Sequence, residues 1–252
     1  MINMKKILPL VVISAITISL PDCKKDVTND SSNKAATIVI HNATLNIPTT
    51  NLLLRMNGGL NISGANASSF GTPSINWSQS AIFNAEGKST AIDILNATDS
   101  SRDFSATYNF KKGGIYSLFL GGFLPNVDPV FIEETNFPFI NLNKIPSSTD
   151  SVINVRFVNL SPNVQPLDIK TNGATANEVT GLAYKGYTPF KAYPAKQGNT
   201  SYSFQIIENG VVLRTQTLNI DATNRFKNVA LVVRGQKGGP MPFRVGIVNY
   251  FQ

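Results

Sequence analysis

The stretch of sequence that decides the fold is 201–220, SYSFQIIENGVVLRTQTLNI. Its first part alternates apolar Tyr202, Phe204 and Ile206 with polar residues, which is the period-two pattern of a strand with one buried face. Asn209-Gly210 follows, and both residues accept the positive φ angles of a two-residue hairpin turn. The residues after the turn return as a second strand. The stretch therefore predicts an antiparallel hairpin with one dry face, the usual state of strands in a β-sandwich.

The same order of short segments occurs twice in the chain. Five segments of the first half have counterparts in the second half, at offsets of about 110 to 117 residues. The pairs are TIVIHN (37–42) with NVRFVN (154–159), LLLRMNG (52–58) with LDIKTNG (167–173), IDILNA (92–97) with QIIENG (205–210), TYNF (107–110) with TLNI (217–220), and YSLFLGG (116–122) with NVALVVRG (228–235). The repeat predicts two β-sandwich domains of roughly seven strands each.

The expected domains are 35–146 and 150–252, because NKIPSSTDS (143–151) has the Pro- and Ser-rich composition of a linker. Composition agrees with an all-β chain. Charged residues make up 15% of the 252 residues, below the roughly 25% that is usual, and this disfavours long helices with many charge pairs.

The formal net charge of +7 is unevenly distributed along the chain. Residues 35–146 carry six basic and seven acidic side chains, whereas residues 147–252 carry eleven basic and five acidic ones. A basic half can attract an anionic glycan, a lipid headgroup or a nucleic acid. Because no dense run of Lys or Arg occurs, a solvated face is the simpler interpretation, and we expect no nucleic-acid partner.

The second half carries a family resemblance. VRFVNLSP (155–162), LDI (167–169), GLAYKGYTPF (181–190) and YSFQI (202–206) resemble the tandem domain of unknown function four-three-nine-seven. The resemblance covers about 152–235, with Ser161-Pro162, Asp168, Tyr184 and Thr188-Pro189 at the family's recurring positions, whereas the first half lacks the Ser-Pro and has Leu53 in place of the Asp. It implies two tandem immunoglobulin-like antiparallel β-sandwich domains, no assigned activity, and a secreted or surface lipoprotein of Bacteroidota type.

The N-terminus reads as an export signal. Lys5-Lys6 precede a mostly apolar run over 7–20, which is a signal-peptide pattern and too short for an ordinary membrane-spanning helix of about 20 residues. The segment ends in LPDC (20–23), which resembles a lipobox, with Asp22 departing from the small residue usual before the cysteine.

We therefore expect 1–22 to be a signal peptide, Cys23 to carry lipid, and 23–34 to be a flexible tether. The protein is then anchored in the cell envelope, at the outer membrane or the cell surface. Cys23 is the single cysteine, so no intramolecular disulfide can form.

The residues needed for common catalytic chemistry are scarce. His41 is the only histidine, which disfavours His-based triads and zinc sites, and we expect it to be structural in the first strand. Asp93, Asp99 and Asp103 leave carboxylate-pair hydrolysis open, although we expect them to be solvated in a turn. Phosphate-binding, dinucleotide-binding and calcium loops are missing from the sequence. The sequence predicts neither an enzyme nor a metal or other cofactor.

Aromatic and basic residues provide the candidate ligand-binding site. Tyr184, Lys185, Tyr187 and Lys191 lie within ten residues, and flat rings there can stack on sugars beside the two amines. The alternative is that Tyr184, Phe190 and Tyr193 simply pack the sandwich. Trp77 is a second candidate with the same two interpretations.

The linker carries a candidate modification. Asp150-Ser151-Val152 matches the Asp-Ser/Thr-aliphatic pattern of O-glycosylation in Bacteroidota, and an exposed linker would make Ser151 an acceptor. The alternative is a chance tripeptide in which Ser151 starts a strand.

Three classes of function remain at this point. We expect an envelope lipoprotein with a binding or structural role, its partner a glycan or an envelope protein. The alternative is a pilin-like subunit that donates FRVGIVNYFQ (243–252) to a neighbour by strand addition. A hydrolase is disfavoured by the scarcity of catalytic residues.

Overall fold

The computed structural model describes residues 35–45, 52–56, 60–61, 77–84, 89–96, 99–138, 151–196, 198, 200–220 and 225–250, and every regular element in these ranges is a β-strand. The first half contains β1 (Ala35–Asn42), β2 (Leu52–Met56), β3 (Leu60–Asn61), β4 (Trp77–Asn84), β5 (Ser89–Asn96), β6 (Arg102–Asn109), β7 (Ile115–Phe123) and β8 (Asn126–Glu133). The second half contains β9 (Val152–Asn159), β10 (Leu167–Thr171), β11 (Val179–Leu182), β12 (Lys191–Pro194), β13 (Ser201–Glu208), β14 (Val211–Asn219), β15 (Asn228–Arg234) and β16 (Arg244–Asn249). The predicted all-β fold is confirmed.

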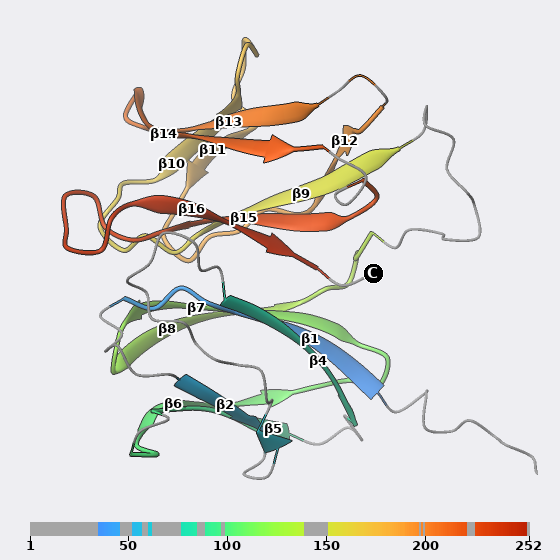
Figure 1. The fold of residues 1–252 in the computed structure, drawn as a ribbon, viewed down its shortest axis with the longest axis vertical. Helices are drawn as coiled ribbons and strands as arrows, with labels where there is room; N and C mark the ends of the chain where they lie inside the picture. Colours follow the sequence, from blue (N-terminus) through green and yellow to red (C-terminus); the bar gives the residue numbers. More distant parts are fainter. Residues whose placement is uncertain are drawn as a thin grey trace, which may run out of the picture.

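The strands form four sheets of four strands, stacked along the long axis of the molecule (Figure 1). Sheet A has the order β4-β1-β7-β8 and sheet B the order β3-β2-β5-β6. Sheet C, β12-β9-β15-β16, and sheet D, β11-β10-β13-β14, repeat these orders with every strand number raised by eight. All five segment pairs found in the sequence fall on counterpart strands, so the internal repeat is a repeat of topology.

Two details of the sandwich differ from the expectation. Each half has eight strands in place of about seven, and each contains a parallel pair, β1 with β7 and β9 with β15. The orders also differ from the ABED and CFG sheets of an immunoglobulin constant domain. Pairing of the first strand with the seventh is a long-range contact, which local alternation of residue types cannot predict.

The hairpin that decides the fold forms as expected. β13 pairs with β14 in antiparallel register, and Asn209 and Gly210 have φ angles of 48° and 80°. Phe204 and Ile206 are fully buried. At 172–173, in contrast, only Gly173 has a positive φ, so this Asn-Gly pair makes a different turn.

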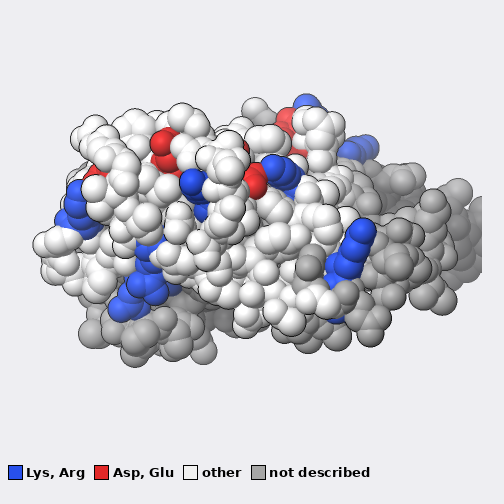
Figure 2. Space-filling view, turned by 90° about the horizontal axis from the view of Figure 1, so that it is seen from above, with Lys and Arg blue, Asp and Glu red and all other residues white. Residues whose placement is uncertain are grey.

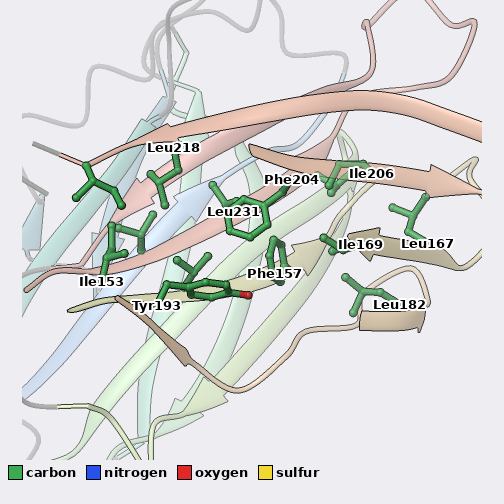
Figure 3. Packing of buried hydrophobic residues seen from close by; sticks show 14 of the residues in the cluster. Ile153, Phe157, Leu167, Ile169, Leu182, Tyr193, Phe204, Ile206, Leu218 and Leu231 are labelled. Atoms are coloured by element: carbon green, nitrogen blue, oxygen red, sulfur yellow. The ribbon is translucent and has the colours of Figure 1, made fainter. Parts of the chain in front are cut away.

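Three apolar clusters hold the stack together. One fills the space between sheets C and D, where Phe157, Tyr193 and Phe204 meet edge to face (Figure 3). A second lies between sheets A and B around Tyr116. The third joins sheets A and C and so combines both halves; we call this interface the seam. Its buried members are Val39, Ala43, Phe119, Val130, Ile132, Phe137, Val158, Leu160, Ala230, Val232, Val248 and Tyr250.

The seam explains why the inner strands are buried on both faces. Seven of the eight residues of β9 and all seven of β15 are buried. Alternate residues of β9 face sheet D, as Phe157 does, or the seam, as Val158 does. Such doubly buried strands are typical of the inside of a layered structure. No helix within the described ranges is long and apolar enough to cross a membrane.

Candidate functional site

The candidate loop after β11 is fixed tightly to the end of β9. The main-chain N–H of Lys185 donates to the carbonyl of Asn159 at 2.7 Å, and the N–H of Asn159 donates to the carbonyl of Gly186 at 2.9 Å. Gly186 also donates to the carbonyl of Ala183, which closes a tight turn. Lys185 has a φ of 64°, a left-handed conformation that is uncommon for a residue with a side chain.

Two residues of this turn cross the seam to reach Asp128 on β8. The Tyr184 hydroxyl donates to Asp128 Oδ2 at 2.8 Å, and Lys185 Nζ lies 3.4 Å from Asp128 Oδ1. Burial raises the pKa of Tyr184, and the hydrogen bond to the Asp128 carboxylate raises it further. The Lys185 and Asp128 side chains remain 44% and 42% exposed, so this pair faces solvent at the edge of the seam.

Tyr187, two residues after Lys185 in the sequence, presents its ring to solvent. Its main chain forms an antiparallel bridge with Val158 of β9, and its side chain is 47% exposed. The guanidinium carbon of Arg156 lies 6.0 Å from its ring centre. The ring therefore belongs to a fixed main chain and yet remains accessible.

The other residues of the predicted cluster do not join Tyr187. Phe190 lies in the seam, edge to face with Phe137 and Tyr250. Tyr193 is 5% exposed in the core between sheets C and D. The amine of Lys191 pairs with Glu178, whose pKa it lowers. The structure thus brings Tyr184 and Lys185 together at Asp128, leaves the Tyr187 ring exposed near Arg156, and places Lys191 at Glu178.

A buried ion pair lies at the centre of the seam. Arg156 on β9 donates through Nη1 and Nη2 to both carboxylate oxygens of Glu134, at 2.6 and 2.7 Å. The two side chains are 4% and 3% exposed. The Ser117 hydroxyl donates to Glu134 Oε1 at 2.5 Å, and the Phe190 ring centre lies 3.9 Å from the guanidinium carbon. Sequence reasoning missed this pair, although an arginine inside the apolar strand NVRFVN was a signal that a buried partner exists.

Ser151 is not the exposed acceptor that the sequence predicted. It is 2% exposed, and its hydroxyl donates to the carbonyl of Ala195 at 2.7 Å. In the folded chain this oxygen lies inside the molecule, where a glycosyltransferase cannot reach it. The residue lies immediately before β9, which begins at Val152, so Ser151 does not itself start the strand as the alternative interpretation held.

The carboxylates expected in one turn occupy three different settings. Asp93 lies in β5, 4% exposed, and accepts hydrogen bonds from Arg55 at 3.0 Å and Ser105 at 2.7 Å. Burial raises its pKa, but these bonds and the nearby arginine charges outweigh burial, so the pKa lies below its ordinary value. Asp99 is in the turn and exposed, and Asp103 is in β6. The expectation of a solvated turn is therefore wrong for Asp93 and Asp103.

The remaining candidates are placed as follows. His41 is fully buried in β1, with its ring centre 6.1 Å from that of Phe119. Trp77 begins β4 and pairs with Asn42 through its main chain, and its side chain lies outside the described part. Cys23 lies outside the described residues. Among the described side chains, no group of three or more His, Cys, Asp or Glu is arranged to hold a metal ion.

Comparison with known proteins adds only distant structural likeness. No family model matches the chain, and no curated protein matches it. A family 26 carbohydrate-binding module from Eubacterium rectale Amy13K, solved with maltoheptaose, is 8% identical over 86% of this chain and 98% of its own, with a TM-score of 0.27. Family 41 carbohydrate-binding modules from streptococcal virulence factors, which recognise α-glucan, are 11% identical over 81% of this chain and 95% of theirs, with a TM-score of 0.25. TM-scores this low do not indicate a shared function.

Proposed function

We propose that this protein is a lipid-anchored, non-catalytic protein of the cell envelope that binds a glycan at the edge of the seam. The observation that carries the proposal is Tyr187, an accessible ring on a fixed main chain, two residues along the chain from Lys185, which forms a solvent-facing pair with Asp128. The export signal and Cys23 support the location, and the stack of sheets supplies a rigid support for the site.

The site combines the two kinds of contact that a sugar needs. A tyrosine ring offers a large apolar surface at little cost in conformational entropy, because its side chain has only two rotatable angles. Lys185 donates and Asp128 accepts hydrogen bonds, so together they match the hydroxyl groups of a sugar. Their 3.4 Å separation is long for a charged pair, and both groups are partly exposed, so a ligand can contact either one.

The fixed geometry favours binding. The turn is held by Asn159 and by the bridge at Val158, so little freedom remains to be lost when a ligand binds. The Tyr184–Asp128 bond also fixes the carboxylate, because one of its oxygens is held by a half-buried hydroxyl.

The pilin-like alternative is less well supported. The C-terminal segment that would be donated forms β16, which pairs with β15 of its own chain from Val229↔Asn249 to Arg234↔Arg244. Tyr250, directly after β16, is 3% exposed and contributes to the seam. Donating this segment would open the interface between the two halves.

Screening residues 24–252 on an array of neutral and anionic oligosaccharides tests the proposal. We expect binding that Tyr187→Phe retains and Tyr187→Ser weakens by about tenfold or more, as for an aromatic hot spot. Val211→Ser is the matched control, since it also removes an exposed apolar side chain (62% exposed) but lies on β14. Failure to retain any glycan, or equal retention by the Tyr187→Ser variant, would refute the proposal.

A further inference from the structure

Loops of both halves meet at the end of the stack where β1 begins, on the right-hand side of Figure 1. The N–H of Gly113 donates to the carbonyl of Ala35 at 2.7 Å, so the turn between β6 and β7 lies beside the first residue of β1. The N–H of Glu134 donates to the carbonyl of Ile115 at 2.8 Å, so β8 ends at the same place.

The second half contributes the starts of β9 and β15 to this end. The side-chain amide of Asn228, the first residue of β15, donates to the carbonyl of Pro138 at 3.0 Å, and Pro138 follows closely after Glu134. The starts of β9 and β15 are adjacent in their parallel pairing. The N–H of Ala195 donates to the carbonyl of Ser151 at 2.7 Å, so the segment after β12 lies there too.

This end of the stack is rich in basic side chains. Its described segments 111–115, 133–138, 195–196 and 225–228 contain five basic and two acidic residues. Of the two carboxylates, Glu134 is buried with Arg156, and Glu133 pairs with Lys111. We call the five basic residues the basic end: Lys111, Lys112, Lys196, Arg225 and Lys227.

Other surfaces have less uncompensated positive charge. At the opposite end of the strands, Lys185 pairs with Asp128, and Lys237 pairs with a glutamate. Figure 2 looks down onto sheet D, where most described atoms belong to uncharged residues and several Lys and Arg side chains lie close to Asp or Glu. In the basic end, Lys112 and Lys196 are exposed, and neither forms a salt bridge with a described Asp or Glu.

The chain enters the fold at the basic end. Cys23 precedes Ala35 by twelve residues, which span at most about 40 Å when fully extended. β1 runs away from this point over eight residues, so the opposite end of sheet A lies about 25 Å farther from the entry of the chain. A lipid on Cys23 would therefore hold the basic end nearer to the membrane than the opposite end.

We propose that the basic end faces the bilayer that holds the anchor and contacts anionic phospholipid headgroups. This inference rests on the lipid anchor of the proposed function and adds an orientation of the folded chain. Each Lys or Arg close to an anionic surface strengthens binding about fivefold. Because the anchor keeps the folded part within reach of the surface, a few such contacts suffice.

An exposed apolar side chain lies close to the basic end. Ile82 of β4 is 75% exposed and is opposite Thr37 of β1, whose N–H donates to the carbonyl of Gly114 in the turn after Lys112. Binding at a membrane interface combines buried apolar area with attraction to anionic lipids. Ile82 can supply the first contribution and the basic end the second.

The first test does not depend on the anchor. Residues 24–252, which retain every described residue, are sedimented with vesicles of phosphatidylcholine and phosphatidylglycerol, or of phosphatidylcholine alone. We expect binding to the anionic vesicles that weakens as salt rises, and that is about tenfold weaker in the Lys112→Gln, Lys196→Gln double variant. The matched control is the Lys170→Gln, Arg214→Gln double variant, which removes the same charge from β10 and β14 of sheet D.

Two outcomes of this test would overturn the proposal, whether or not Cys23 carries lipid. One is no more binding to the anionic vesicles than to the neutral ones. The other is equal weakening by the two double variants, which would mean that the basic end has no special part in binding.

The second test measures the orientation of the full chain. The lipidated protein is reconstituted into the same two kinds of vesicle, and its lysines are acetylated with a water-soluble reagent and quantified by mass spectrometry. We expect Lys112 and Lys196 to react severalfold more slowly on anionic than on neutral vesicles, and Lys170 and Lys237 to react equally on both. Unchanged rates at Lys112 and Lys196, or equal slowing at all four lysines, would contradict this orientation.

Discussion

Replacing Glu134 by Gln removes one charge of the buried ion pair in the seam and so tests how much this charge contributes to stability. The Arg156–Glu134 pair is doubly hydrogen-bonded, at 2.6 and 2.7 Å, and both side chains are less than 5% exposed. Loss of one partner leaves the other charge buried and uncompensated, which typically costs about 3–5 kcal/mol. With a urea m-value of about 2.5 kcal/mol/M, the unfolding midpoint should fall by about 1–2 M.

The control is the neighbouring residue in the sequence. Glu133 pairs with Lys111 at 2.6 Å, but these side chains are 40% and 74% exposed. Because water screens exposed pairs, Glu133→Gln should leave the midpoint almost unchanged. Both variants remove one negative charge from adjacent positions, so any difference between them reports burial at the seam and not net charge.

A double-mutant cycle completes the measurement. Arg156→Met alone should also destabilise the chain, since Glu134 then keeps its charge but loses both hydrogen bonds from the guanidinium. The Glu134→Gln, Arg156→Met double variant should be markedly more stable than the sum of the two changes predicts, because no charge is left buried. Urea unfolding followed by circular dichroism measures all four proteins. Additive effects, or a Glu134→Gln midpoint close to that of Glu133→Gln, would refute the reasoning.

Three further predictions concern other parts of the chain. The pKa of Asp93 is lowered in the folded chain, so its carboxylate stabilises the fold at pH values above its unfolded pKa of about 4. This stabilisation is lost as the pH falls through the lower pKa of the folded state. The difference in stability between the unchanged protein and Asp93→Asn should therefore shrink in acid, which urea unfolding at several pH values would measure. Gly235→Ala should destabilise the chain far more than Gly210→Ala in thermal unfolding, although both glycines have φ near 80°. A Cβ at 235 would lie 2.1 Å from the carbonyl oxygen of Pro242, whereas a Cβ at 210 would meet nothing within 4 Å. Equal losses of stability in the two variants would contradict this prediction. In cells fed an alkyne fatty acid, the full-length protein should become labelled and its Cys23→Ser variant should not. Label on the variant would contradict a lipid anchor at this cysteine.

Local patterns predicted much of the fold and little of the site. Alternation around Phe204 and the Asn209-Gly210 turn gave the β13–β14 hairpin, because both signals act within a few residues. The repeat placed counterpart strands correctly, because the same topology reproduces the same order of segments. The parallel pair of β9 with β15 and the packing of sheet A on sheet C depend on residues far apart in the sequence, and no local period encodes them.

The errors in the site have the same origin. The cluster from Tyr184 to Tyr193 looked like one loop, yet β12 begins inside it and turns Tyr193 toward a core while Phe190 enters the seam. Ser151 lies in a segment with the composition of a linker, but its position next to β9 buries its side chain. The alternation in NVRFVN is typical of a half-buried strand, whereas β9 is buried on both faces because sheet A covers its second face.

The proposed binding surface and the seam are held by some of the same residues. Arg156 donates to Glu134, lies against the Phe190 ring and is 6.0 Å from the ring centre of Tyr187, so one guanidinium connects the centre of the seam with its exposed edge. Asp128 belongs to the first half, and the turn that reaches it belongs to the second. The complete set of Tyr187, Lys185 and Asp128 therefore exists only while the two halves are docked. If the proposal holds, the tandem repeat has a site that neither copy contains by itself, because the proposed site is built from a turn of the second half and the outer strand β8 of the first half.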